Sequence, residues 1–267
     1  MRTIPLENLH TDCIALSILC MSVAIAWEKD NPVIPEKDTL SEYISSTHFD
    51  YHDAENDPDG VDTTWQTYFV WLMDALDLQM DQKLEFYKYR DRAHLKRLTG
   101  RETNGFAEFG TCNFHTSWKI DNHESVHVAV TQLIGHPPAL FNEGKAVAHQ
   151  ADYFRYPAFI PGWNGQDYHR LARDFQRNDE LPPLGELPGI YTFWDYDSNI
   201  TYPVSGAFVN YLIMNYGLAK MKAFISSCDS QGSKGKIRSD FQGIYAMHID
   251  SIWHSWKEYI ATYEGSQ

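Results

Sequence analysis

Residues 121–149 read DNHESVHVAVTQLIGHPPALFNEGKAVAH, and they predict two helices joined by a sharp reversal. Asp121 and Asn122 supply good N-cap chemistry for the first helix. The Gly-His-Pro-Pro run at residues 135–138 breaks that helix, and a second helix starts at about Ala139. Because the reversal is short, we expect the two helices to run antiparallel, side by side.

The first helix carries two histidines at metal-ligand spacing. A helix repeats every 3.6 residues, so His123 and His127 lie one turn apart on the same face. Two such imidazoles can hold one zinc ion, and Glu124 can act on a zinc-bound water. The neighbouring residues are apolar, so the helix should be buried, where a metal would satisfy all three polar side chains. The alternative is that the histidines bond neighbouring polar groups while Glu124 lies at the surface.

Glu143 on the second helix is the best-placed third ligand. After His127 the first helix advances about 10 Å, and the second returns about 7.5 Å to Glu143, at about 1.5 Å per residue. The antiparallel pair therefore brings Glu143 back near the level of His127. Competing ligands fit worse, because His136 lies in the reversal and His149 lies more than a turn beyond Glu143. The pattern with a third histidine six residues after the second would need histidine at Leu133.

The N-terminal residues 1–26 form a separate unit. Residues 13–26 are uncharged and mostly apolar, and they end in Ala-Ile-Ala, a small-x-small pattern suited to signal-peptidase cleavage. The run is too short for a transmembrane helix, which needs about 20 residues. We therefore expect a signal peptide and a mature chain without a stable membrane span, secreted or held in the cell envelope or periplasm. The alternative is a buried N-terminal helix.

The cysteines bear on a possible disulfide, and the net charge bears on the expected binding partners. Removal of residues 1–26 leaves Cys112 and Cys228, and two cysteines in an exported chain predict one disulfide, unless both remain buried thiols. The chain of 267 residues has a formal net charge of -14. A nucleic acid, with its anionic backbone, is therefore not an expected partner.

The order of the predicted elements gives an α+β fold class. Strands are expected at residues 47–52, 83–89, 105–110 and 115–120. Further helices are expected at residues 63–78, 203–216, 218–227 and 249–263. We therefore expect a small mixed sheet with the histidine helix in residues 27–160, followed by a helical subdomain in residues 161–267.

Two motifs together resemble those of the gluzincin zinc peptidases, whose third ligand is a glutamate on the next helix. They are His-Glu-x-x-His at residues 123–127 and Asn-Glu-Gly-x-Ala at residues 142–146. The likeness covers about residues 105–216, and it is closest to the small peptidase-MA-like domains and the aminopeptidase branch. The interval between the motifs is shorter than in the large aminopeptidases. Lys145 stands where the family usually has a bulky apolar residue.

The resemblance implies a gluzincin-like fold and one zinc ion per chain, held by His123, His127 and Glu143. Glu124 would then take the proton of the attacking water and deliver it to the leaving amine. Tyr202, just before a predicted helix, resembles the tyrosine that stabilises the oxyanion in this family. The glycine that follows it lies one residue further on than in the family.

The resemblance also assigns substrate contacts to the strand at residues 105–110, because the family places there the edge strand that pairs with the substrate backbone. Gly105 and Ala107 are therefore candidate substrate-binding residues. Glu108 resembles the glutamate that binds the amino terminus of the substrate in aminopeptidases, although Phe109 replaces the asparagine that follows it there. Otherwise Glu108 is a solvent-facing strand residue.

Three functions fit these patterns. The first is a zinc metallopeptidase that acts on peptides or proteins. The second is a catalytically silent binding protein that keeps the fold. The third is a zinc hydrolase of a non-peptide amide or ester.

Overall fold

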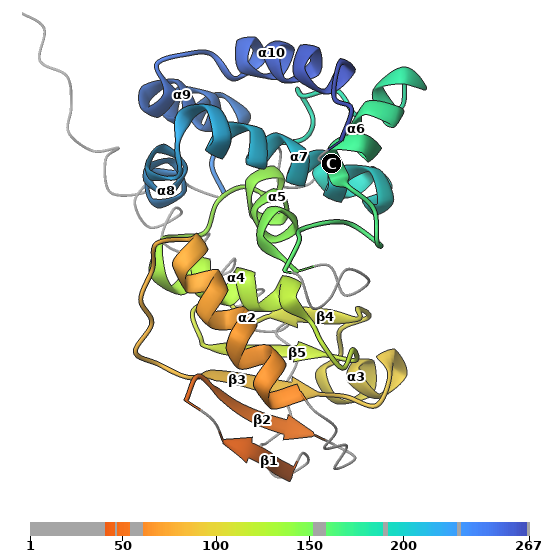
Figure 1. The fold of residues 1–267 in the computed structure, drawn as a ribbon, viewed down its shortest axis with the longest axis vertical. Helices are drawn as coiled ribbons and strands as arrows, with labels where there is room; N and C mark the ends of the chain where they lie inside the picture. Colours follow the sequence, from red (N-terminus) through yellow and green to blue (C-terminus); the bar gives the residue numbers. More distant parts are fainter. Residues whose placement is uncertain are drawn as a thin grey trace, which may run out of the picture.

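One five-stranded mixed sheet forms the first part of the molecule (Figure 1). A computed structural model describes residues 41–45, 47–53, 61–151, 159–188, 192–228 and 231–265, and the expected signal peptide lies outside these ranges. In spatial order the strands are β1 (Ser41–Ser45), β2 (Phe49–Asp53), β3 (Leu84–Lys88), β5 (Asn113–Thr116) and β4 (Gly105–Ala107). The three inner strands are mutually parallel, and the edge strands β1 and β4 are antiparallel to their neighbours.

Successive strand residues point to opposite faces of the sheet, so apolar side chains occur on both faces. Helices cover both of them. On one face, Phe86 and Phe114 pack on Trp65 of α2 (Val61–Ala75), with ring centroids 5.1 and 5.7 Å apart. The histidine helix α4 (Asn122–Leu133) lies on the same side. On the other face, Tyr87 and Phe106 cluster with Leu95 of α3 (Arg92–Thr99).

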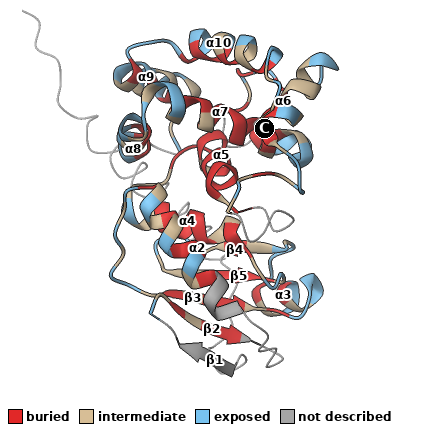
Figure 2. Ribbon diagram, in the orientation of Figure 1, coloured by how far each residue is buried: buried red, intermediate tan, exposed pale blue. Residues whose placement is uncertain are grey.

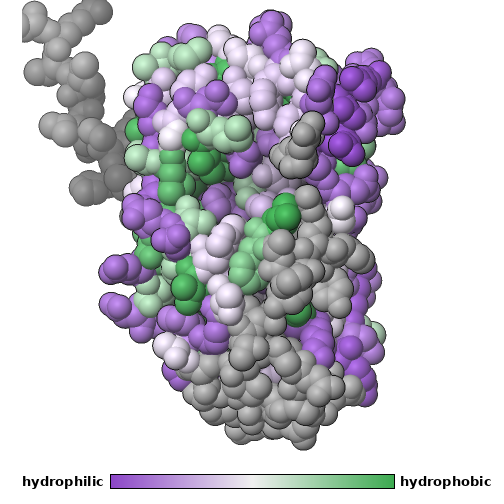
Figure 3. Space-filling model, in the orientation of Figure 1, coloured by the Kyte–Doolittle hydropathy of each residue, from purple (hydrophilic) through white to green (hydrophobic). Residues whose placement is uncertain are grey.

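The second part of the described chain is helical. Its elements are α6 (Tyr168–Arg177), the short 3-10 helix η3 (Thr192–Asp195), α7 (Ser198–Tyr216), α8 (Leu218–Ser227), α9 (Lys234–Tyr245) and α10 (Ile249–Ala261). Between the two parts runs α5 (Ala139–His149), which is buried along almost its whole length (Figure 2). In the view of Figure 3, hydrophobic residues gather on the surface about half-way up the molecule, at the level of α5.

The helices α5 and α7 approach each other unusually closely. A Cβ on Gly144 would lie 2.5 Å from the carbonyl oxygen of Ser205, so only glycine fits there. A Cβ on Gly206 would likewise collide with Val147. This close packing brings Glu143 on α5 and Tyr202 on α7 to facing positions.

The α+β class is confirmed, and the predicted helix pair is present. The strand predicted at 115–120 is partly wrong, because the strand is Asn113–Thr116 and its pairing with β4 reaches no further than the hydrogen bond from the Ser117 N–H to the Asn104 carbonyl oxygen. The helix predicted from residue 203 begins one turn earlier, where Asp197 caps it, so Tyr202 lies inside α7. Strand β1 and helix α6 were not predicted. Within the described ranges, no helix is long and apolar enough to cross a membrane.

Candidate metal centre

The helices α4 and α5 bring three predicted side chains to one point. The Asp121 carboxylate accepts a hydrogen bond from the Glu124 N–H at 3.2 Å and starts α4. The chain then reverses at Gly135, which has a φ of +152° and where a Cβ would lie 2.9 Å from the Ile225 carbonyl oxygen, so a side chain does not fit. The returning helix α5 therefore carries Glu143 back to the two histidines.

Three ligand atoms form a nearly equilateral triangle. His123 Nε2 lies 3.0 Å from His127 Nε2 and 3.1 Å from Glu143 Oε2. The third side, from His127 Nε2 to Glu143 Oε2, measures 3.3 Å. This group could hold a metal ion.

Burial and mutual charge govern the protonation of these residues. Burial opposes charge on His123, but the hydrogen bond and charge of Glu143 outweigh it and raise the pKa of His123 to about 9. Burial wins for His127 and lowers its pKa. Although burial favours the neutral acid, the two histidines hold the pKa of Glu143 well below its usual range. Glu143 is therefore a carboxylate, as a metal ligand must be.

Gln150 fixes the orientation of His123, a role that the sequence did not reveal. Gln150 Nε2 donates to the carbonyl oxygen of Gly162 at 2.7 Å, which turns Oε1 toward His123 Nδ1 at 2.8 Å. Nδ1 must then carry a proton, so in the neutral ring, the form that binds a metal, the lone pair is on Nε2 and faces the other two ligand atoms. In contrast, His127 Nδ1 is buried and has no hydrogen-bond partner among the described residues.

Tyr68 on α2 clamps the two ends of the helix pair. Its hydroxyl lies 3.2 Å from the carbonyl oxygen of Asn122 and 3.1 Å from that of His149, and it shares one proton between them. Asn122 Nδ2 also donates to the Ala151 carbonyl oxygen at 2.9 Å. The start of α4 and the end of α5 are thus joined through Tyr68 and Asn122, and the sequence had indicated only a capping role for Asn122.

Glu124 lies between the ligand triangle and strand β4. Its side chain lies against β4, where a Cβ added to Gly105 would be 3.2 Å from Glu124 Cγ. Burial, followed by the nearby charge of Asp121, raises the pKa of Glu124 to about 8. A Cβ on Gly105 would lie 2.6 Å from Asp121 Oδ2, so glycine is required where β4 meets the start of α4.

Tyr202 reaches the same point from α7. Its ring stacks on that of His123, with centroids 5.6 Å apart, which places the tyrosine beside the triangle. Burial, and then the charges of Glu143 and Glu124, raise the pKa of Tyr202, so its hydroxyl keeps its proton. The tyrosine is therefore placed as a hydrogen-bond donor beside the triangle.

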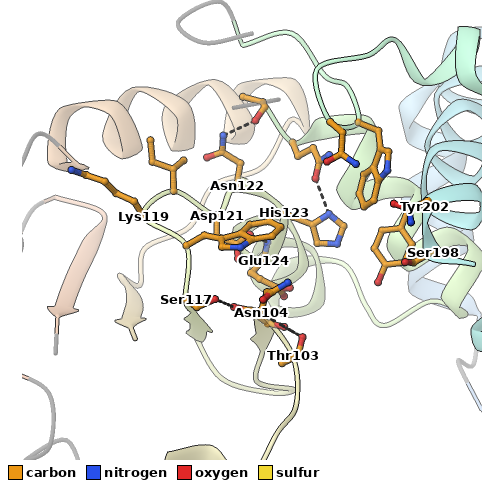
Figure 4. A pocket seen from close by; sticks show the side chains of 18 residues that line it. Thr103, Asn104, Ser117, Lys119, Asp121, Asn122, His123, Glu124, Ser198 and Tyr202 are labelled. Carbon is orange, nitrogen blue, oxygen red and sulfur yellow. Dashed lines mark hydrogen bonds between the residues drawn. The ribbon is translucent and has the colours of Figure 1, made fainter. Parts of the chain in front are cut away.

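A cavity of about 900 Å³ opens beside this centre (Figure 4). His123, Glu124 and Tyr202 form part of its wall. The remaining wall comes from β4 and the loop before it, the loop from Ser117 to Asp121, the end of α5, and Trp163, Asn164, Ser198 and Asn199. The wall combines amide and hydroxyl groups with the indole rings of Trp118 and Trp163.

Other predicted residues lie away from the triangle. Glu108 is buried rather than solvent-facing, and it does not line the cavity. No disulfide joins Cys112 to Cys228, and the Cys112 thiol donates instead to Gln82 Oε1 at 3.1 Å. His149 is buried, and its Nδ1 bonds the Lys145 carbonyl oxygen at 3.0 Å. Lys145 is buried too, and its Nζ has no hydrogen-bond partner in the described part of the chain.

Comparison with protein-family models, with curated proteins and with solved structures found no match for this chain.

Proposed function

We propose that this chain is a zinc-dependent metallopeptidase. The observation that carries the proposal is the triangle of His123, His127 and Glu143, with sides of 3.0 to 3.3 Å, beside Glu124 and an open cavity. The function rests on this arrangement together with the resemblance to gluzincin peptidases.

The triangle has the size that zinc requires. Zinc bonds imidazole nitrogen and carboxylate oxygen at about 2.0–2.1 Å, so neighbouring ligands of a tetrahedral ion lie roughly 3.3 Å apart. Two imidazoles and one carboxylate also leave the fourth position open, as in catalytic rather than structural zinc sites. When bound, zinc polarises the substrate carbonyl and lowers the pKa of a water molecule.

Glu124 is the general base of the proposed reaction. Its carboxylate accepts a proton from the attacking water and delivers that proton to the leaving amine. A buried position and a pKa near neutrality suit both transfers, because the same group must take up and release one proton.

Tyr202 donates a hydrogen bond to the carbonyl oxygen as that oxygen gains negative charge. Its proton is retained in the buried site, and its ring is held in place by His123 on one side and Trp163, 5.0 Å away between centroids, on the other. A donor fixed in advance at a developing charge lowers the barrier without reorganisation.

Zinc content and peptide cleavage test the proposal together. We expect purified wild type to contain one equivalent of zinc and to cleave members of a mixed peptide library. Glu124→Gln keeps the shape of the side chain but cannot take up a proton, so we expect it to retain zinc and to lose cleavage by at least about 100-fold. Mass spectrometry of the library and metal analysis of both proteins give these values.

The other outcomes are equally informative. Bound zinc without Glu124-dependent cleavage would contradict the peptidase proposal and favour a silent binding protein. Glu124-dependent hydrolysis of non-peptide esters or amides alone would favour the broader zinc hydrolase. Absence of zinc from a chain with intact ligands would contradict every metal-dependent function.

A further inference from the structure

A row of four stacked rings crosses the sheet and ends on strand β4. The rings belong to His52 on β2, Tyr87 on β3, His115 on β5 and Phe106 on β4, and each pair is directly opposed in the strand register. Neighbouring ring centroids lie 4.8, 4.7 and 4.5 Å apart, with interplanar angles of 10 to 12°. These spacings match the distance between strands, so each ring packs face to face on the next.

His115 at the centre of the row is also fixed in its own plane. Its Nδ1 lies 2.8 Å from the Tyr89 hydroxyl, and its Nε2 lies 3.0 Å from Glu108 Oε1. Both ring nitrogens therefore have protein partners, while Tyr87 and Phe106 cover the two ring faces. The side chain is fully buried.

Glu108 ties this row to the turn between β4 and β5. Besides His115, its carboxylate accepts from Asn113 Nδ2 at 2.8 Å and from the Thr111 hydroxyl at 3.1 Å. Burial opposes ionisation of Glu108, but these donors outweigh it and hold the pKa of its carboxyl below its usual value. The backbone N–H of Glu108 also donates to the Asn113 carbonyl oxygen at 3.0 Å. Both the side chain and the backbone of Glu108 are thus hydrogen-bonded within the hairpin.

The strand held in this way is an edge strand of the sheet, and its outer edge lies beside the start of the histidine helix α4. Asn104 and Glu108 form hydrogen bonds to the partner strand, so the alternation of an antiparallel pair turns the N–H and C=O groups of Gly105 and Ala107 outward. The Thr103 hydroxyl donates to the Gly105 carbonyl oxygen at 2.8 Å and accepts from the Gly105 N–H at 3.4 Å, so a peptide that adds here replaces this side chain. Glu124 lies against this edge, because a Cβ added to Gly105 would be 3.2 Å from Glu124 Cγ. The position of β4 therefore sets the position of the proposed base relative to any peptide that adds to this edge.

We infer that Glu108 and His115 are positioning residues, which hold the β4 edge in place for an extended peptide beside the metal centre. Glu108 acts through the hairpin and not by binding the amino terminus of the substrate. This inference rests on the proposed peptidase function for its kinetic consequences, but not for its structural ones.

The kinetic test compares two substitutions on two substrates. One peptide that wild type cleaves is prepared with a free and with an acetylated amino terminus. Glu108→Ala removes all three side-chain hydrogen bonds, and we expect KM to rise about 10-fold on both peptides, with little change in kcat, because strand addition contributes to ground-state binding. Glu108→Gln can still bond His115 and Asn113, so we expect it to stay within about 3-fold of wild type. Glu102→Ala, at an exposed glutamate before β4, is the matched control.

Two results would overturn the inference. One is a loss confined to the free amino terminus and equal in Glu108→Gln and Glu108→Ala, since an amine anchor needs the negative charge. The other is a lower melting temperature in Glu108→Ala with KM unchanged, which would make the residue structural only.

Amide hydrogen exchange tests the positioning role without relying on catalysis. A milder variant, Tyr89→Phe, tests it without removing the Glu108 side chain. Tyr89→Phe deletes only the hydroxyl on His115 Nδ1, so we expect a smaller rise in KM than for Glu108→Ala and faster amide exchange across residues 104–108 in both variants. If wild type cleaves no peptide, the peptidase proposal fails, and faster exchange at β4 still supports the positioning role. Unchanged exchange at β4 in both variants would contradict it.

Discussion

Two clusters of glutamate and histidine lie in this protein, and they use the same side chains in opposite ways. In the sheet, both nitrogens of His115 and both oxygens of Glu108 have protein partners. In the metal centre, the Nε2 atoms of His123 and His127 face each other at 3.0 Å and share a single oxygen of Glu143. His127 Nδ1 has no partner in the described residues.

The difference separates a structural cluster from a binding site. A saturated cluster has no lone pair left to offer, so it can only hold its surroundings in place. At the triangle, both Nε2 atoms and one Glu143 oxygen converge on one point, where without a metal ion the proton on His123 Nε2 has to serve both of the other atoms. Burial makes that convergence costly, and a cation at the centre removes the cost.

Removal of a metal ligand should produce the largest effect and would break the comparison most directly. Zinc at about 1,000 times its Kd should stabilise wild type by about 4 kcal/mol, because only the folded chain holds the triangle. We expect His127→Ala to lose this stabilisation entirely, as measured by urea unfolding with and without zinc. His115→Gln should keep it, since its cluster has no free ligand atom. A zinc response in His127→Ala equal to that of wild type would place the ion elsewhere.

Gln150 offers a smaller and more specific perturbation. Its loss frees His123 to rotate and to take the wrong tautomer, and such outer partners typically contribute 10- to 100-fold to metal affinity. We therefore expect Gln150→Ala to weaken zinc binding by about 10- to 100-fold in a competition titration with a chelator. Gln132→Ala is the control, because Gln132 lies on α4 but bonds the Thr111 carbonyl away from the triangle. Equal losses in both variants would show a general effect on α4.

The helix pair could be predicted from sequence because its determinants are local. The spacing of His123 and His127, the Pro-Pro breaker and the length of the return helix together fix where Glu143 lies. The supporting contacts could not be predicted, because they join residues distant in the chain. The row from His52 to His115 depends on strand register, and Tyr68 bonds Asn122 across 54 positions.

The position of the Glu108 side chain also could not be predicted from the sequence. Glu108 was expected either to contact the substrate or to be a solvent-facing strand residue, but it lies just beyond the end of β4 and folds back onto His115. Alternation describes a residue within a strand, and it says nothing about a side chain at the turn.

Lys145 gives the smallest expected effect and sharpens the comparison, because it is a buried polar group that neither cluster satisfies. Its Nζ has no hydrogen-bond partner in the described residues, and burial holds the pKa of its ammonium well below the usual value. A buried unsatisfied group costs about 1–3 kcal/mol, so we expect Lys145→Met to raise the free energy of unfolding by about 1–2 kcal/mol in urea at neutral pH. Lys220→Met, at an exposed lysine on α8, should change it little.

The pH dependence of this gain identifies its cause. Because the folded pKa of Lys145 lies below the unfolded one, the unfolded chain binds more protons between the two values. Wild-type stability therefore rises with pH through that window, up to the unfolded lysine pKa of about 10.4, and Lys145→Met should remove this rise. The advantage of the variant should then shrink as pH increases. If Lys145→Met is less stable than wild type at every pH, the buried amine stabilises the fold through an interaction with a partner, as Glu108 does, and the prediction is wrong.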